Sequence, residues 1–476
     1  MSVFNRKRLQ LSAIGILALV VLVSYSIFNG RPNELAAELE PPPWNQIRNE
    51  TLRERIHSRY LKTTHGIVST SALSDLGQLY HSNGYLNLAR QVYELLRERG
   101  LISPEERHRL ARILSAYGLQ RQAIDEYKRV LASNSDYTPA HIHLGNALLK
   151  SGDAGQAETA FRSAIETDSQ SAHALLGLAR IRIERKDWEE ARKILEAATR
   201  ISNFQIGTDI LATVYEELGE SNEANRLRRD HDFGAYRDLS DPWMDEMLVD
   251  CYDTFRLATA AGMASFRGDS DKANELIGRA IELDPTDPML HFQLGGFHRS
   301  EGEIASALQS YRKSVQLKPD FSDGWFQMYQ IHQNAGSPRE ANLILEDGFR
   351  ACPDSPALLL EMAERMRREN RADRAIEFTR KAIELRPHEA QAFLVLARLF
   401  LQTNQIDAAV SAFEDALRVE PGNPMALSTL TINAIDKRDR STADRYFERI
   451  RKQARIPPQS VEQLAAKYEA QFGSRP

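Results

Sequence analysis

The chain has 476 residues, 42% hydrophobic and 8% aromatic, which is too many for one ordinary core and favours several domains or a lengthwise repeat array. Its 61 basic and 66 acidic residues are spread along the sequence, so it lacks the basic stripe of a nucleic-acid-binding protein. Its two cysteines, about a hundred residues apart, exclude a disulfide framework and a cysteine zinc knuckle.

The N-terminus predicts a membrane anchor. Three basic residues at positions 6–8 precede an apolar run over residues 9–28, which as a helix spans roughly 30 Å. No Ala-x-Ala-like cleavage site closes the run, and acidic residues follow it, so we expect an uncleaved signal-anchor helix. The positive-inside rule then leaves residues 1–8 in the cytosol and the body outside it, in the periplasm of a bacterium. Cleavage near Ala36 is the alternative.

A connector is expected over residues 29–69. The run Pro41-Pro42-Pro43-Trp44 is stiff and extended, because proline fixes its own backbone and restricts the residue before it. The charged residues 45–60 predict a short helix.

From residue 70 to residue 229 the chain is periodic. Each period contains a leucine followed by a small residue, a turn glycine in most periods, an alanine, and a large residue. The periods begin with Leu76-Gly77 (Gly84, Ala89, Tyr93), Leu110-Ala111 (Gly118, Ala123, Tyr127), Leu144-Gly145 (Gly152, Ala157, Phe161), Leu178-Ala179 (Ala191, Leu195, Ala198) and Leu211-Ala212 (Tyr215, Gly219, Ala224).

An insertion over residues 230–254 interrupts the period, because the next anchor, Ala261, arrives about fifteen residues late. Asp241 as a cap and Pro242 in the first turn predict one extra helix. Its common face would carry Trp243, Met244, Met247, Leu248 and Cys251. The aspartates and His231 of this segment lack the spacing of a calcium loop, so we interpret them as helix caps and a solvated loop and predict no metal.

Residues 255–455 repeat with a period of 34. A proline recurs at each interval, preceded by an alanine twelve residues earlier and a small residue five residues earlier. Small residues are expected where two helices cross closely, and proline is expected to end the second helix. The prolines are Pro285, Pro319, Pro353, Pro387 and Pro421, and the alanines are Ala273, Ala307, Ala341, Ala375 and Ala409. Residues 456–476 should hold a capping helix from Ser460 to Phe472.

This pattern resembles the tetratricopeptide-repeat family, and Leu294-Gly295, Gly302, Ala307, Tyr311 and Pro319 fit it best. The resemblance implies an all-α fold, a right-handed α-solenoid. Counting by the anchors gives about eleven helix pairs, the insertion divides them into two blocks, and the apolar run predicts one transmembrane helix before them. The resemblance also implies that the first helix of each pair lines a concave face that binds extended peptides or partner helices.

The position one after each small anchor is expected to point into that concave groove. Its residues are polar and mildly basic in the N-terminal block, which suits hydrogen bonding to a peptide backbone or an acidic segment, although any solvated helix face is polar. They are Gln78, Arg112, Asn146, Arg180 and Thr213, then Gly262, Gly296, Gln330, Glu364, Arg398 and Ile432, with Arg299, Gln333 and Arg367 one turn on.

No phosphate loop, dinucleotide turn, HExxH or GxSxG motif occurs, so we predict neither an enzyme nor a cofactor. His141 and His143 lie two residues apart and point in different directions on a helix. We expect a membrane-tethered scaffold or assembly factor that binds partner proteins or peptides and no nucleic acid. A component that handles polysaccharide or secreted cargo in envelope export is the alternative, and an enzyme with its site in the insertion is a third hypothesis.

Overall fold

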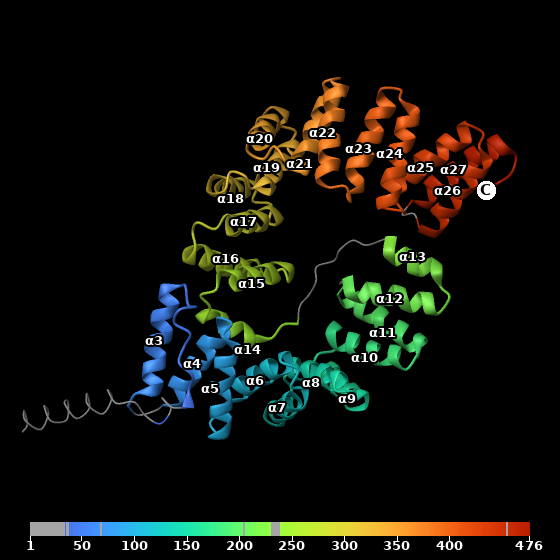
Figure 1. Ribbon diagram of the computed structural model, residues 1–476. Helices are drawn as coiled ribbons and strands as arrows, with labels where there is room; N and C mark the ends of the chain where they lie inside the picture. The colour runs from blue at the N-terminus through green and yellow to red at the C-terminus, as the bar shows by residue number, and fades with distance from the viewer. Residues whose placement is uncertain (1–33, 35–37, 67–68, 203–204, 230–238, 454–455) are drawn as a thin grey trace, which may run out of the picture. The chain divides into compact units, whose positions relative to one another are not determined.

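The computed structural model describes residues 34, 38–66, 69–202, 205–229, 239–453 and 456–476 (Figure 1). The predicted cytoplasmic tail and the apolar run over residues 9–28 lie outside these ranges. Among the helices within them, none has the length and apolar character needed to cross a membrane.

The described residues contain helices and no strand longer than a single bridge, and eleven helix pairs follow one another along the chain (Figure 1). The first five are α4 (Thr70–Ser82) with α5 (Leu86–Glu98), α6 (Pro104–Ala116) with α7 (Gln120–Ser133), α8 (Thr138–Lys150) with α9 (Ala154–Thr167), α10 (Ala172–Glu184) with α11 (Trp188–Ile201) and α12 (Gln205–Glu217) with α13 (Ser221–Arg229). The next six are α15 (Thr254–Phe266) with α16 (Ser270–Leu283), α17 (Pro288–Ser300) with α18 (Ile304–Leu317), α19 (Ser322–Asn334) with α20 (Pro338–Ala351), α21 (Pro356–Arg368) with α22 (Ala372–Leu385), α23 (Ala390–Gln402) with α24 (Ile406–Val419) and α25 (Pro424–Asp436) with α26 (Arg440–Gln453).

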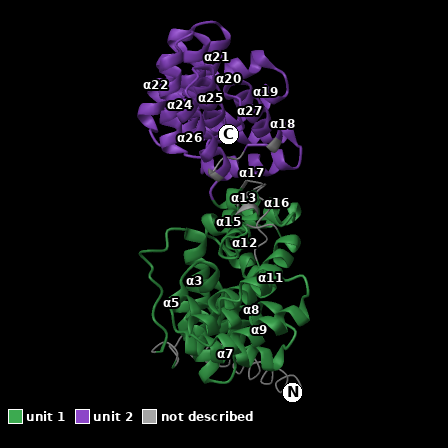
Figure 2. Cartoon of the chain, turned by 90° about the vertical axis from the view of Figure 1, so that its right-hand side faces the viewer, with its two compact units in different colours: residues 1–283 green, residues 284–476 purple. Residues whose placement is uncertain are grey.

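The chain divides into two compact units, residues 1–283 and 284–476 (Figure 2). The first unit also holds α3 (Glu50–Thr64), α14 (Pro242–Asp245) and the 3-10 helix η1 (Glu246–Asp250), and the second ends in α27 (Pro458–Phe472). Helix α3 begins later than predicted from residue 45, because the side chain of Asn49 caps it by accepting a hydrogen bond from the Leu52 amide.

Proline ends second helices, as the sequence predicts, and polar caps begin several helices. Each of the five prolines spaced by 34 residues lies two positions beyond the end of a second helix, where it cannot continue the hydrogen-bond ladder. At the start of α6, Ser103 and Glu106 form a reciprocal capping box, with Pro104 in the first turn.

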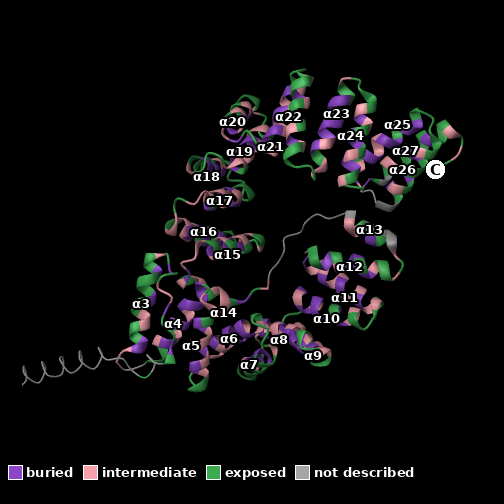
Figure 3. Ribbon diagram, viewed as in Figure 1, coloured by how far each residue is buried: buried purple, intermediate pink, exposed green. Residues whose placement is uncertain are grey.

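The expectation that small residues occupy the helix crossings is confirmed, and the structure shows what they face. Gly77, Gly145 and Gly295 each lie sixteen residues before a buried aromatic of the same pair. A Cβ on Gly145 would lie 2.7 Å from the ring of Phe161, so no larger residue fits there. The buried residues run along the faces that the paired helices share (Figure 3).

The turn inside most pairs requires a left-handed backbone. Gly152 adopts φ +88°, and Lys186, which holds the same place one repeat later, adopts φ 58°. For a residue with a Cβ this conformation costs roughly 1–2 kcal/mol, whereas glycine adopts it freely.

We therefore expect Lys186→Gly to raise the free energy of unfolding by about 0.5–1 kcal/mol, since the relief of strain exceeds the entropy that glycine loses on folding. Gly152→Ala should lower it by a similar amount. Urea unfolding followed by circular dichroism tests the pair, and a change of the same sign in both variants would contradict this account.

The extra helix expected in the insertion begins at Pro242, as predicted. It tightens into a 3-10 helix after Asp245 and ends at Asp250. The side chain of Asp241 makes no capping bond. The carbonyl groups of this segment bond to side chains of other helices instead of completing a helical ladder, and such bonds compete with regular helix.

Candidate peptide-binding face

The predicted groove residues of the N-terminal block all lie on the first helices α4, α6, α8, α10 and α12. We call the surface that carries Gln78, Arg112, Asn146, Arg180 and Thr213 the ladder face. Three of these residues, Asn146, Arg180 and Thr213, line one cavity. The other two lie where the inserted segment docks. Among the described residues, the inserted segment covers the ladder face over α4 to α8, and a cavity lies in the face over α8 to α12.

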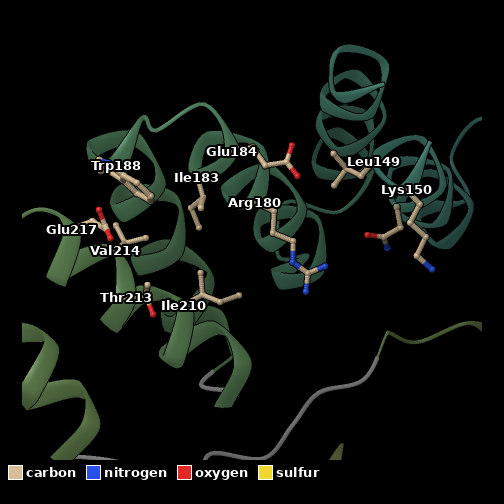
Figure 4. Close-up of a pocket in the computed structure, with 11 residues that line it drawn as sticks. Leu149, Lys150, Arg180, Ile183, Glu184, Trp188, Ile210, Thr213, Val214 and Glu217 are labelled. Atoms are coloured by element: carbon tan, nitrogen blue, oxygen red, sulfur yellow. The ribbon is translucent and has the colours of Figure 1, made fainter. Parts of the chain in front are cut away.

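The open half is a cavity of about 580 Å³ (Figure 4). Its apolar wall includes Trp188, Ile183 and Val214, which gather at one end, and Leu149 lies at the other (Figure 4). Trp188 is the first residue of α11, so it reaches the ladder face from a second helix. A cavity of this size and lining can bury one or two large apolar side chains.

Charged and amide groups surround that apolar wall. Arg180 is exposed and lines the cavity with Lys150, Glu184 and Glu217. Asn146 adds an amide that donates and accepts hydrogen bonds. These groups can bond to the backbone of an extended peptide while the apolar wall takes its side chains.

The covered half is built around the buried carboxylate of Asp241, whose residue is 5% exposed. His108 Nε2 lies 2.9 Å and Arg112 Nη1 2.8 Å from its Oδ2 atom, and the Tyr137 hydroxyl donates to Oδ1 at 2.6 Å. His143 Nε2 lies 3.7 Å from the same Oδ2 and accepts from Arg112 at 3.0 Å. Four side chains from α6, α8 and the turn before α8 thus surround one carboxylate of the insertion.

Trp243 provides the second anchor of the insertion. Its ring stacks on Tyr137 with centroids 3.7 Å apart and planes at 15°. The Trp243 carbonyl accepts from Arg109 Nη2 at 2.9 Å, and its amide donates to the Tyr137 hydroxyl at 3.2 Å. The same tyrosine therefore contacts the carboxylate, the ring and the backbone of the segment.

Helix α4 binds the end of the segment through backbone groups. Asn83 Nδ2 donates to the Asp250 carbonyl at 2.8 Å, and Asn83 Oδ1 accepts from the Tyr252 amide at 2.7 Å. The Ser82 hydroxyl donates to the same Asp250 carbonyl at 3.0 Å. Arg59 of α3 pairs with the Asp250 carboxylate at 3.1 Å. An amide that pairs with both a donor and an acceptor recognises extended chain without reading its side chains.

The electrostatics of the covered half favour a fixed charge on the insertion. Burial acts to raise the pKa of Asp241, but its contacts with His108, His143 and Tyr137 outweigh burial and hold that pKa well below its usual range. Burial, and then the Asp241 contact, raise the pKa of Tyr137. Burial lowers the pKa of His143 to about 4, with Arg112 adding to the effect and Asp241 opposing it.

Stability around His143 is expected to fall as pH drops from 6.5 towards 4. Its pKa in the fold lies below the ordinary 6.5, so in this window the unfolded chain binds a proton that the folded chain does not. Arg112 and His108 of α6, Tyr127 of α7 and Asp241 face it. The free energy of unfolding should change by at most about 1.4 kcal/mol per pH unit through this one group.

Urea unfolding of the unsubstituted chain and of His143→Gln between about pH 7 and pH 4.5 measures this slope. The substituted chain should lose less stability across the window. Equal slopes in the two proteins would contradict the assignment.

Three donor atoms in this cluster are close enough to hold a metal ion. Those of His108, His143 and Asp241 lie within 4.8 Å of one another. However, the Arg112 guanidinium contacts both His143 and Asp241, so a cation would have to displace a fixed positive charge. The arrangement fits an ion pair better than a metal centre. Asp241 occupies the cap position that the sequence predicts, but its side chain contacts other helices and makes no capping bond.

The C-terminal ladder residues are not brought together in this way. In the part of the chain that the structure describes, Arg299 donates to Gln327, Gln333 donates to Tyr329 at 2.8 Å, and Arg367 pairs with Glu364 at 2.6 Å. These are local contacts within or between neighbouring helices. Gln330 is half-buried and Arg398 is exposed. Their role as partner contacts stays a prediction.

Sequence reasoning missed several residues of the ladder face. His108 lies one turn before Arg112 and is fully buried, whereas the sequence indicated only a surface or groove histidine. Asn83 is the residue that follows α4, and Tyr137 immediately precedes α8. The helical spacing of His108 from the ladder position Arg112 was a usable signal. Nothing in the sequence placed Trp188 beside the cavity.

The described residues form an all-helical array of repeated helix pairs. Models of the family described as tetratricopeptide repeat match residues 148–204, 264–320 and 366–431. The chain therefore contains tetratricopeptide repeats.

Curated relatives share part of the chain. Human protein O-mannosyl-transferase TMTC1 is 27% identical over 237 residues, which are 49% of this chain and 25% of that protein. Cellulose synthase operon protein C of Xanthomonas axonopodis pv. citri is 29% identical over 219 residues, 44% of this chain and 14% of that protein. The chain thus spans a quarter or less of the length of these two relatives.

Similar solved structures include yeast Tom70, with a TM-score of 0.37, 16% identity and coverage of 84% of this chain and 95% of that one. The Cut9-Hcn1 hetero-tetramer of the APC/C has a TM-score of 0.36, 12% identity and coverage of 91% and 99%.

Proposed function

We propose that this chain is a binding scaffold whose ladder face takes up an extended segment of a partner protein, and that it performs no chemistry itself. One observation carries the proposal. Residues 241–252 of the chain already lie on this face, bound through carbonyl and amide groups by side chains of α4 and α6. The adjoining cavity is lined by the other three ladder residues, Asn146, Arg180 and Thr213, and it has an apolar wall. A partner segment would place apolar side chains against Trp188 and its backbone against Asn146 and Arg180.

The proposal is tested with an array of synthetic peptides of about 12 residues, each with a leucine, phenylalanine or tryptophan between flanks of varied charge. The intact chain should retain a subset of them. Trp188→Ala should weaken that binding by about 10–30-fold, because a buried aromatic anchor contributes roughly 2 kcal/mol. Arg180→Glu should change which flanking charges are preferred.

Lys193→Ala is the matched control, because Lys193 is exposed on the same helix as Trp188 and pairs only with an exposed glutamate among its described ion pairs. It should leave retention unchanged. Retention that is insensitive to both Trp188→Ala and Arg180→Glu would remove the cavity from the binding site.

We further propose that residues 9–28 tether the scaffold to a membrane, with the repeats outside the cytosol. The apolar run and the basic residues before it support this placement. The full chain should stay in the membrane fraction after alkaline carbonate extraction, and a variant lacking residues 9–28 should not. Protease added from outside the cytosol should digest the repeats. Release of the full chain by carbonate would rule out the tether.

A role in handling polysaccharide or secreted cargo during envelope export is the second candidate. The similarity to cellulose synthase operon protein C of Xanthomonas axonopodis and, at 22% identity, of Pseudomonas fluorescens favours it. Soluble cellulose oligosaccharides should then compete with the array peptides for the Trp188 cavity. Peptide binding that these glycans leave unchanged would favour the protein-binding scaffold.

A further inference from the structure

We propose that the covered half of the ladder face is itself a peptide-binding site, whose resident ligand is residues 241–252. The ligand from a partner is an acidic peptide that carries an aromatic residue two positions after its key carboxylate. Such a segment displaces the resident one. This inference rests on the proposed peptide binding by the ladder face and names the chemistry of the partner.

The resident segment is held as a bound peptide is held. The side chains of Asn83, Ser82 and Arg109 bond to its backbone at Trp243, Asp250 and Tyr252. On its other side, Arg279 Nη1 of α16 donates to the Leu248 carbonyl at 2.8 Å. A segment from another chain presents the same backbone groups, so most of these contacts do not depend on the covalent connection.

Two side chains give the site its selectivity. The carboxylate of Asp241 is enclosed by His108, Arg112 and Tyr137, and a neutral residue there would leave the guanidinium without its buried partner. The Trp243 ring stacks on Tyr137, which a residue without an aromatic ring cannot do. The site therefore selects an acidic residue followed by one other residue and an aromatic.

Several side chains of the segment contribute little to this recognition, because Val249 is 69% exposed and the side chains of Asp245 and Glu246 are 43% and 67% exposed. Met247 and Cys251 are buried and add apolar contact. Because the resident segment is tethered, it competes at an effective concentration that for short flexible connections is in the millimolar range. A partner peptide must bind tightly enough to displace the tethered segment. Removal of the two anchor side chains, Asp241 and Trp243, should therefore let a peptide added in solution bind.

The test uses a fluorescein-labelled synthetic peptide of residues 239–252 and the full-length chain. In the receptor, Asp241→Ala and Trp243→Ala remove both anchors of the resident segment. We expect this receptor to bind the peptide at least about 10-fold more tightly than the unsubstituted chain does, because the resident segment no longer competes. Adding Arg112→Ala to the receptor should lower the affinity about 10-fold. A peptide with alanine at positions 241 and 243 should not bind.

Three outcomes overturn the inference. The first is a receptor that keeps its helical circular dichroism and binds the peptide no more tightly than the unsubstituted chain. The second is binding that Arg112→Ala leaves unchanged. The third is a dimer by light scattering in which the segment of one copy fills the site of another, because the occupant would then be a second copy.

If the receptor loses its helical signal, hydrogen exchange of the unsubstituted chain decides the question. Amides of residues 243–252 should exchange through a local opening, faster than the amides of α6 and α8. Exchange of the segment only together with those helices would show a permanent part of the fold and overturn the inference. Trp188→Ala should leave binding of the 239–252 peptide unchanged. A negative result for this peptide therefore does not count against peptide binding at the Trp188 cavity, and a negative result at the cavity does not count against this site.

Discussion

Phe161→Ala is expected to lower the free energy of unfolding by about 3–5 kcal/mol, a loss at the upper end for a single substitution in a repeat. Phe161 lies on α9 and is fully buried. Its ring fills the space that Gly145 of α8 and Gly177 of α10 leave open, where a Cβ would lie 2.7 Å and 2.4 Å from it. Because neither glycine can move a side chain into the space, the cavity stays open and the cost lies near the upper limit.

Urea unfolding followed by circular dichroism measures this loss, and hydrogen exchange locates it. Amides of α8 to α10 should lose protection while those of α23 and α24 keep theirs, since each repeat contacts mainly its neighbours. Phe255→Ala is the control, because Phe255 is 78% exposed, and its effect should stay within about 0.5 kcal/mol. A loss below about 1 kcal/mol for Phe161→Ala would refute the close packing of this ring against the two glycines.

The effect of Gly145→Ala on the free energy of unfolding should change sign when the Phe161 ring is removed. Gly145→Ala should destabilise the unsubstituted chain, because the new Cβ meets the Phe161 ring. In the Phe161→Ala background the same change should stabilise by up to about 1 kcal/mol, since alanine forms helix better than glycine and the space is empty. The double-mutant cycle measures this coupling, and additive effects would show that the two positions do not touch.

Asp241→Ala is the second large effect, an expected loss of about 3 kcal/mol. The substitution removes the one carboxylate that faces both His108 and Arg112, and it leaves the Tyr137 hydroxyl without its acceptor. The loss of hydrogen-exchange protection should concentrate in residues 243–252 and in α6 and α8. Helices α10 to α13 should keep their protection, because they do not touch the segment's two anchors.

Asp245→Ala is the matched control, because it changes the same residue type in the same segment. The Asp245 side chain is 43% exposed and pairs with Arg267 at 3.9 Å. Such an exposed pair contributes about 1 kcal/mol or less. Equal losses for the two aspartates would show that burial of Asp241 does not determine the stability of the segment.

Much of the repeat architecture was predictable from local sequence. Proline and capping residues act within a few positions, so the helix ends at Pro285 or Ser103 follow from the residues themselves. The glycine and aromatic pairs, such as Gly145 with Phe161, were visible as a recurring spacing. The ladder positions Asn146, Arg180 and Thr213 were implied by the family resemblance, and they line one cavity.

The insertion could not be predicted in the same way. Asp241 and Pro242 have the local signature of a helix start, and a helix does begin there. The carboxylate nevertheless bonds to residues more than a hundred positions earlier, such as His108 and Tyr137. A local sequence pattern cannot predict a contact between residues so far apart in the chain.

The sequence by itself therefore determined the helix pairs, their ends and the positions that line the ladder face, because each depends on contacts within one or two repeats. Only the tertiary structure decided which part of that face is open and which part the chain covers with its own residues 241–252. The physical reason is that docking of the insertion depends on a buried carboxylate, a stacked ring and backbone hydrogen bonds that exist only once α4, α6 and α8 lie side by side.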